Sequence, residues 1–499
     1  MSRIEDVLLA DLKSLIAELG TKEGVNSAAV YDTAQVLRLC PPDEGVSDGL
    51  DWLLSRQQAD GGWGAPSRPM YRDIPTLAAV LVLDVHEEHV GASAAVRAGM
   101  AFLARQAGQW AEPLPDDLPG AAELLLPRLV EQARAQGLEV ARERYAALFA
   151  MRERRLARIA RIPVLAGTTA AHGWEGWGTE PDPRVFDGSG GVGNSPAATA
   201  AWAHAAAGRP ELSGAVLHAK SFLSRAWRAT GLNIPGVVPE SWPLDRFEQA
   251  FGLYPLFLAG LLGHPALRGA IEPQIQALAG AMRPDGIAST DYTLPDGDDT
   301  AAALALLHTA GRRVDGSAML HFEDGDHFCT WRGELQPSIS VTARAVHALA
   351  LLGVETGRAE AYLLERQRDD GRWTGDKWNG SWLYTTSQVM LALAHRGHER
   401  AVRAALAVLL RHQSRAGGWG ADGPTLEETA YVLLALRGLP LDTKAREAAR
   451  RAERWMLDEY RPFTPEGAYC WLAKEPYRPH RISRLFELAA MAGAVLGGE

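Results

Sequence analysis

The sequence contains Gln57-Gln-Ala-Asp-Gly61-Gly-Trp63, which follows the pattern Gln-x3-Gly-x-Trp. The same pattern recurs in Gln367-Arg-Asp-Asp-Gly371-Arg-Trp373 and in Gln413-Ser-Arg-Ala-Gly417-Gly-Trp419, whose starts are 46 residues apart (413 − 367). In each copy we expect an apolar helix to end at the Gln, a glycine turn to follow, and the Trp to pack back. Repeats of this length are typical of stacked helical hairpins. We interpret the tryptophans as staples for helix ends, which inform about the fold and not about the chemistry.

Helical periodicity extends outward from these repeats. Apolar residues recur at spacings of three and four in residues 36–54, 76–83, 342–352 and 429–436. Alternating strand patterns are scarce, so the predicted fold is all-α. One repeat lies near the N-terminus and two lie in the C-terminal half, and a stretch rich in Pro and Gly separates them at 231–243. We therefore expect two helical units with a boundary near residue 233.

The composition excludes several classes of partner. With 51 Lys plus Arg against 61 Asp plus Glu, the 499-residue chain has a net charge of −10, so a nucleic-acid partner is not expected. Three scattered cysteines fit no disulfide framework, which favours a reducing, cytoplasmic location. We expect no secretory signal and no membrane-spanning helix, while peripheral membrane contact stays open. The oligomeric state cannot be predicted.

An acidic cluster is the sharpest chemical feature of the sequence. Asp296, Asp298 and Asp299 precede Thr300 and an apolar helix. Asp and Thr are common helix caps, which is one explanation. Three close carboxylates repel one another, however, and their repulsion raises at least one pKa, so that one Asp can remain a protonated acid. The helix N-terminus opposes this rise, and a Mg²⁺ or Ca²⁺ site is a further alternative.

With these residues in view, the sequence resembles the class II terpene cyclases. The Asp-x-Asp-Asp motif of this family matches residues 296–299. In the family, the middle Asp of the motif protonates an isoprenoid alkene. The QW motifs of the family resemble the three repeats described above. Segments 29–34, 195–200 and 243–248 are similar to segments of the branch that cyclises prenyl diphosphates to labdane-type skeletons. The resemblance covers nearly the whole chain.

This resemblance implies a fold of two α/α barrels, the β and γ domains, with the active site between them. It assigns residues 1–23 to an initial helix of the β domain and 24–232 to the inserted γ domain. Residues 233–499 then form the rest of the β domain and contain the acidic motif.

The resemblance also suggests where a diphosphate binds. Glu123, in Leu118-Pro-Gly-Ala-Ala-Glu123, is similar to a Glu associated with Mg²⁺, although Ala121 and Ala122 depart from the family pattern. Arg158 takes the place of a diphosphate-binding Lys, and Lys377 resembles another basic position. A solvent-facing helix surface is the alternative for both Glu123 and Arg158.

The residue that would remove the final proton is suggested in the same way. His172 lies in a segment similar to one whose His helps to remove that proton, but the family's partner Asn is replaced by Glu240. A satisfied structural histidine is the alternative.

Other residues of the β domain are candidates for stabilising a cation or orienting the acid. Aromatic rings can stabilise a cation through their faces, and Thr342 and Arg344 lie in a segment similar to one beside the acid. The candidates are Trp331, Trp378, Trp382, Tyr384, Thr342 and Arg344.

We therefore expect a class II cyclase in which Asp298 protonates geranylgeranyl diphosphate, tuned by Asp296 and Asp299, to give a bicyclic diphosphate. Farnesyl diphosphate giving a drimane skeleton, a squalene- or hopene-type cyclase, and a noncatalytic isoprenoid-binding toroid are the alternatives. No Asp-Asp-x-x-Asp motif of the class I synthases occurs in the sequence. The stereochemistry of the product is not predicted.

Overall fold

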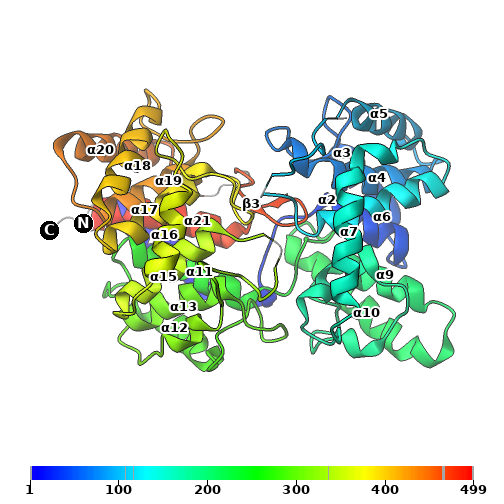
Figure 1. Ribbon diagram of the computed structural model, residues 1–499, viewed down its shortest axis with the longest axis horizontal. Coiled ribbons are helices and arrows are strands. Elements are labelled where there is room, and N and C mark those ends of the chain that lie inside the picture. Colours follow the sequence, from blue (N-terminus) through cyan, green and yellow to red (C-terminus); the bar gives the residue numbers. More distant parts are fainter. Residues whose placement is uncertain (1–2, 107, 116, 335, 463–466, 497–499) are drawn as a thin grey trace.

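The computed structural model describes residues 3–106, 108–115, 117–334, 336–462 and 467–496. Figure 1 shows two helical lobes side by side, and the described residues contain only two short hairpins besides helices. The predicted all-α class is confirmed. No helix in the described ranges is both long and apolar enough to cross a bilayer.

The lobe formed by the N-terminal half is an α/α barrel. Its inner helices contact one another in a closed ring, and these are α2 (Val30–Leu39), α4 (Asp73–Val85), α6 (Ala122–Ala135), α8 (Trp174–Trp177) and α9 (Pro196–Ala206). The outer helices are α3 (Val46–Ser55), α5 (Ala92–Arg105), α7 (Ala146–Ile159) and α10 (Ser213–Ala226). This lobe corresponds to the predicted γ domain.

The other lobe is a larger barrel, which corresponds to the predicted β domain. Its closed inner ring consists of α11 (Asp245–Leu258), α13 (Gly297–Thr309), α15 (Ile339–Leu351), α17 (Trp382–His395), α19 (Leu426–Arg437) and α21 (His480–Leu496). Its outer helices are α1 (Arg3–Glu18), α12 (Arg268–Ala281), α14 (Ser317–Leu320), α16 (Gly357–Glu365), α18 (Glu399–His412) and α20 (Thr443–Asp458). Helix α1 packs against α12 and α21 and so completes the outer ring.

Short elements connect the helices. The hairpins pair β1 (Glu323–Asp324) with β2 (His327–Phe328) and β3 (Trp471–Leu472) with β4 (Pro476–Tyr477). The 3₁₀ helices are η1 (Thr21–Glu23), η2 (Pro69–Tyr71), η3 (Arg142–Tyr145), η4 (Thr169–Gly173), η5 (Pro183–Val185), η6 (Pro210–Leu212) and η7 (Trp227–Thr230).

Apolar patterning decides which helices lie inside the barrels. Ten of the thirteen residues of inner helix α13 are buried, as expected for a helix that is surrounded by others. Outer helix α20 buries only Ala445, Ala448, Ala452 and Met456, a stripe at helical spacing, and exposes its charged residues. The inner rings therefore form the cores.

The Gln-x3-Gly-x-Trp repeats close the helical hairpins, as predicted. The Gln367 side chain donates to the carbonyls of Gly371 (3.0 Å) and Ala401 (3.0 Å), while the Trp373 indole donates to Leu363 (2.7 Å). The copies beginning at Gln57 and Gln413 make the same three bonds to their own neighbours. All three tryptophans are fully buried, so their role is structural.

The chain enters the γ domain between α1 and α2, and two further segments join the domains. Residues 233–244 lead from the γ domain back to the β domain, where α11 begins at Asp245. Within this segment, Val237 and Val238 pack in the hydrophobic clusters of the γ domain. The β3–β4 hairpin lies between the lobes (Figure 1), and the Gly120 amide donates to the carbonyl of Ala473 there. We propose that the domain limits are those predicted, 24–232 for γ, with 233–244 as the crossing segment.

Candidate active site

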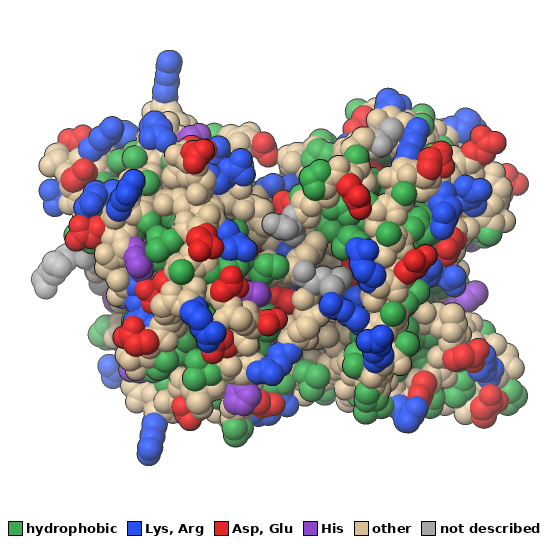
Figure 2. Space-filling view, viewed as in Figure 1, with side chains coloured by type: hydrophobic (Ala, Val, Ile, Leu, Met, Phe, Trp, Pro, Cys, Tyr) green, Lys and Arg blue, Asp and Glu red, His purple; other side chains and the backbone are tan. Residues whose placement is uncertain are grey.

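A cavity of about 710 Å³ lies between the two domains and is lined by residues of both. Its size falls within the usual range of small-molecule sites. Figure 2 shows the hollow between the lobes. The structure places these predicted site residues on its wall: Glu123, Arg158, His172, Asp296, Asp298, Asp299, Trp331, Lys377 and Trp378.

The acidic motif lies where α13 begins, at the cavity wall. Asp296 caps the helix, and its Oδ1 accepts the Asp299 amide at 2.8 Å. Asp296 and Asp299 are each only 3% exposed. The Asp298 side chain is 14% exposed, so it is the most accessible of the three to a molecule in the cavity. Helix capping therefore explains the position of Asp296 but not that of Asp298, which lines the cavity.

Arg344 connects this acid to the core of the β domain. Its guanidinium, on α15, forms an ion pair with Asp298 and donates a second hydrogen bond to the Tyr384 hydroxyl. It also lies over the Phe251 ring, with 4.6 Å between the guanidinium carbon and the ring centroid. A fully buried guanidinium fixes the orientation of the carboxylate that it pairs with.

Burial raises the pKa of all three carboxyl groups. It raises the pKa of Asp296 to about 7, and it raises the pKa of Asp299 well above its ordinary value, with a further contribution from the neighbouring Asp296. Burial also raises the pKa of Asp298, and the Arg344 guanidinium opposes that rise. The motif therefore holds protons more tightly than exposed aspartates do.

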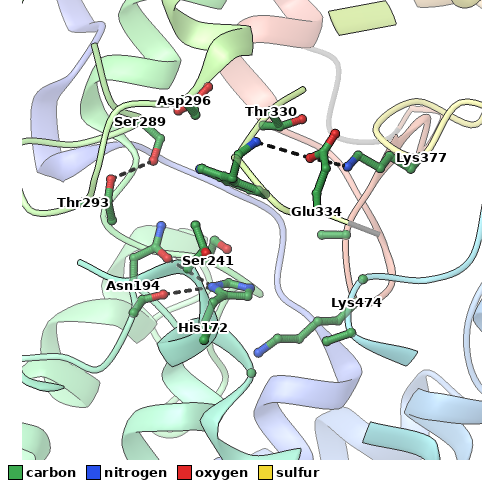
Figure 3. A pocket seen from close by; sticks show the side chains of 18 of the residues that line it. His172, Asn194, Ser241, Ser289, Thr293, Asp296, Thr330, Glu334, Lys377 and Lys474 are labelled. Carbon is green, nitrogen blue, oxygen red and sulfur yellow. Dashed lines mark hydrogen bonds and ion pairs between the residues drawn. The ribbon is translucent and has the colours of Figure 1, made fainter. Parts of the chain in front are cut away.

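His172 lies on the γ side of the same cavity. Its Nδ1 lies 2.9 Å from the Gly193 carbonyl and 3.1 Å from Asn194 Oδ1, so Nδ1 carries the proton and donates it (Figure 3). Nε2 is then an acceptor, 3.9 Å from Glu240 Oε2. Burial and the nearby Lys474 charge lower the pKa of His172 to about 3. The imidazole is therefore neutral near pH 7, as a base must be.

Other basic and acidic groups line the cavity from both domains. Arg155 and Arg158 of α7 and Glu123 of α6 line the cavity from the γ domain, and Arg155 Nε lies 3.6 Å from Glu123 Oε1. From the β domain, the Lys377 ammonium donates to Glu334 Oε2 at 2.7 Å and to the Gln336 carbonyl at 2.8 Å. An ammonium has three protons, and the residues that the structure describes accept two of those of Lys377.

The comparisons with known proteins agree with this geometry. A family model described as the squalene-hopene cyclase C-terminal domain matches residues 332–432. The chain is 43% identical over its whole length to (+)-kolavenyl diphosphate synthase of Herpetosiphon aurantiacus, 99% of which it covers. It is 31% identical over 93% of its length to copalyl diphosphate synthase of Streptomyces cyslabdanicus, 91% of which it covers. The chain belongs to the bacterial class II diterpene cyclases.

Structural similarity extends over the whole of this cyclase. The solved ent-copalyl diphosphate synthase from Streptomyces platensis matches it with a TM-score of 0.79 at 28% identity, covering 99% of this chain and 100% of that one. The predicted family, the paired α/α barrels and the assignment as an enzyme are confirmed.

One buried cluster of charged residues in this cyclase has no pattern in the sequence that could have predicted it. Lys474, in the β3–β4 hairpin, donates to Glu175 Oε1 (2.9 Å) and Ser195 Oγ (2.7 Å), and lies 3.6 Å from Asp32 Oδ1. These carboxylates and Glu240 outweigh burial and raise the pKa of Lys474. The cluster lies at the cavity wall and joins the domains.

Some predicted residues of the cyclase lie off the cavity wall. Thr342 Oγ1 bonds to the backbone of Phe328 and Ser338 and not to the acid. The Trp382 ring packs against His412, 5.1 Å between centroids, and is not among the residues that line the cavity. Tyr384 lies behind Arg344 and contacts the acid only through it. Thr342 is thus not bonded to the acid that it was predicted to orient, and Trp382 and Tyr384 do not line the cavity.

Of the four predicted aromatic residues, Trp331 and Trp378 line the cavity, together with Phe247, Phe251 and Tyr477, which were not predicted. The rings of Trp331 and Trp378 meet edge to face with centroids 5.4 Å apart. The Trp378 indole donates to Thr330 Oγ1 at 2.8 Å, and the Gly297 amide of the acidic motif donates to the Thr330 carbonyl at 2.9 Å. This loop thus fixes two rings beside the acid.

The predicted Mg²⁺ can be tested against the donors present. No group of three His, Cys, Asp or Glu side chains in the described part of the chain is arranged to hold a metal ion. Mg²⁺ commonly takes one or two carboxylates together with waters and substrate phosphates. Glu123, which is 8% exposed and lines the cavity, fits this shared type of site.

Proposed function

We propose that this cyclase converts geranylgeranyl diphosphate into a bicyclic diterpenyl diphosphate and retains the diphosphate. The main support is the placement of Asp298, flanked by two buried carboxyl groups, on the wall of a cavity that basic residues of both domains also line. Both curated relatives are named as synthases of diphosphates.

Asp298 begins the reaction as the acid. Its O–H bond breaks as the proton forms a C–H bond with the terminal alkene, which leaves a tertiary cation. The Asp298 carboxylate formed in this step is stabilised by the Arg344 guanidinium beside it. Asp296 and Asp299 supply the buried, proton-retaining surroundings that keep the acid protonated beforehand.

Ring closure follows within the cavity. Each internal alkene attacks the cation formed before it, so that two carbon–carbon bonds form and the positive charge moves along the chain. Trp331 and Trp378 present aromatic faces and edges beside the acid. A ring face can stabilise a nearby desolvated cation by about 2 kcal/mol.

His172 ends the reaction by accepting a proton. Its Nε2 is unprotonated, since Nδ1 donates to the Gly193 carbonyl. A C–H bond adjacent to the final cation breaks, its electrons form the product alkene, and the proton passes to Nε2. The imidazolium formed lies beside the buried carboxyl group of Glu240.

The diphosphate is bound by basic residues of the cavity wall. Arg158 and Arg155 are suited to bidentate contacts with phosphate oxygens, and Lys377 contributes a point charge. Glu123 would hold Mg²⁺ together with the diphosphate, and the ion would neutralise phosphate charge when bound.

We place the cyclase in the cytoplasm. Its thiols at Cys40, Cys329 and Cys470 are free. Free thiols are usual for proteins of reducing compartments.

The test is incubation of the purified protein with C15, C20 and C30 substrates and Mg²⁺, then dephosphorylation and identification of the skeletons by mass spectrometry. We expect a bicyclic C20 product, whereas a C15 or C30 product alone would replace the substrate assignment. Asp298→Asn should abolish turnover and keep the fold, and exposed Asp285→Asn should have no effect. Normal turnover by Asp298→Asn would discard the mechanism.

A further inference from the structure

The mouth of the cavity has an unusual apolar rim. Ile162, Leu165 and Leu294 are 49%, 42% and 52% exposed. Ile162 and Leu294 also line the cavity, so they lie at its opening. The Leu294 amide donates to the Gly167 carbonyl at 3.4 Å, which brings the two segments together. We call residues 160–166 with Leu294 the rim.

The rim sequence is apolar along most of its length. After Arg161 it reads Ile162-Pro-Val-Leu-Ala166, and all of these residues except half-buried Val164 are exposed. Exposed large apolar side chains occur at nine places among the described residues, and three of the nine are in the rim. Contiguous exposed apolar groups mark interaction surfaces, whereas single ones are ordinary.

Positive charge accompanies the rim. Arg154, Arg158 and Arg161 are exposed. Arg154 and Arg158, four residues apart, share one face of α7, and Arg161 lies in the turn that follows the helix. None of these three has an ion-pair partner within 4 Å in the described part of the chain, whereas Arg152 and Arg155 are paired. The helix has one acidic residue, Glu153.

We propose that the rim and these arginines dock the cavity mouth onto a membrane surface that contains anionic phospholipids. Apolar side chains flanked by cations are the pattern that inserts into the headgroup region, because the side chains leave water while the guanidinium groups meet lipid phosphates. The unpaired arginines favour this partner over an uncharged one.

Docking has a consequence that rests on the proposed function. A prenyl diphosphate has a long apolar tail and a charged head, so it partitions into membranes. A cavity mouth held at the lipid surface receives the tail directly, and the neighbouring arginines lead the diphosphate toward Arg158.

Vesicle binding by the full-length protein tests the docking itself. We expect co-sedimentation with phosphatidylcholine vesicles that contain 30% phosphatidylglycerol and weak binding to pure phosphatidylcholine. Arg161→Gln should weaken binding on the order of fivefold, and Leu165→Ser should weaken it several-fold. Leu320→Ser is the matched control, since Leu320 is also 42% exposed but lies on α14. Absence of binding, or an equal loss in the control, overturns the proposal.

A second measurement separates docking from closure of the rim over the substrate. With substrate dispersed in detergent, Leu165→Ser should turn over at the unchanged rate, and with substrate in the anionic vesicles it should be slower. An equal loss in both assays would make the rim a lid and overturn docking. The vesicle-binding assay uses no substrate, so its result stands even if the proposed reaction fails.

Discussion

The Lys474 ammonium lies 2.9 Å from Glu175 Oε1, although the lysine belongs to a hairpin of the β domain and the glutamate to the γ domain. Both side chains are almost fully buried, at 1% and 2% exposed. A charge from one domain is thus neutralised inside the other, next to the cavity that both domains form. This contact makes domain packing and site geometry depend on each other.

Lys474→Met should destabilise the protein by about 3–5 kcal/mol, because it leaves buried carboxylates without their cation. Chemical denaturation measures this loss. Adding Glu175→Gln to Lys474→Met should recover part of the stability, since one uncompensated charge is removed as well. A loss below about 1 kcal/mol in the single variant would show that the carboxyl groups are already neutral.

Arg344→Gln should lower kcat by about 10²–10³-fold, because the Asp298 carboxylate formed on proton donation loses its stabilising charge. KM should change little, since Arg344 is fully buried and not on the cavity wall. Tyr384→Phe, which removes only one hydrogen bond of Arg344, is the matched control and should cost less. Steady-state kinetics measure both variants, with thermal melting as the check on folding. An unchanged kcat in Arg344→Gln would contradict the role of this ion pair.

Local patterns in the sequence predicted the repeats and the start of the acidic helix. The repeats depend on Gln, Gly and Trp within seven residues, and the acidic motif, whose catalytic role is a proposal, on four successive residues. The Lys474 to Glu175 contact spans 299 positions and has no local pattern, so it could not be predicted. Trp378 and Trp382 are neighbours in the sequence, but Trp382 begins α17 and its ring packs on His412 away from the cavity.

The contribution of Asp296 to the stability of the protein should fall as the pH rises from about 4 to 7. Burial raises the pKa of Asp296 to about 7, whereas an unfolded Asp titrates near 3.9. The native state therefore binds this proton more tightly, and the resulting stabilisation is complete below about pH 4 and lost as the pH rises through about 7.

Asp296→Asn removes this titration, so the free energy of unfolding of the unchanged protein minus that of the variant should fall as the pH rises. Urea denaturation at pH 5, 6 and 7 measures this difference. His172 titrates in both proteins and cancels, whereas the pKa of Asp299 is raised partly by Asp296, so its change adds to the difference in the same direction. Parallel curves would contradict the raised pKa of Asp296.

Removal of Mg²⁺ should raise KM for the diphosphate substrate about tenfold, since in the proposed site the ion and Glu123 would bind it jointly. Glu123→Gln should raise KM by a similar factor and should no longer respond to EDTA. Glu131→Gln is the control, because Glu131 pairs with Arg152 at 3.7 Å and does not line the cavity. If Glu123→Gln remained as sensitive to EDTA as the unchanged protein, the ion would bind elsewhere.

Gly371→Ala should lower stability more than Gly375→Ala, although both glycines have positive φ, at 98° and 80°. An alanine in this conformation costs about 1–2 kcal/mol at either position. A Cβ at position 371 would also lie 2.6 Å from the Ala404 carbonyl oxygen, whereas one at 375 would meet nothing within 4 Å. The clash falls at the turn of a Gln-x3-Gly-x-Trp repeat, so Gly371→Ala should also disturb the Gln367 bonds to Gly371 and Ala401. Thermal melting of the two variants isolates this contact, and equal melting temperatures would mean that the repeat tolerates a side chain at its turn.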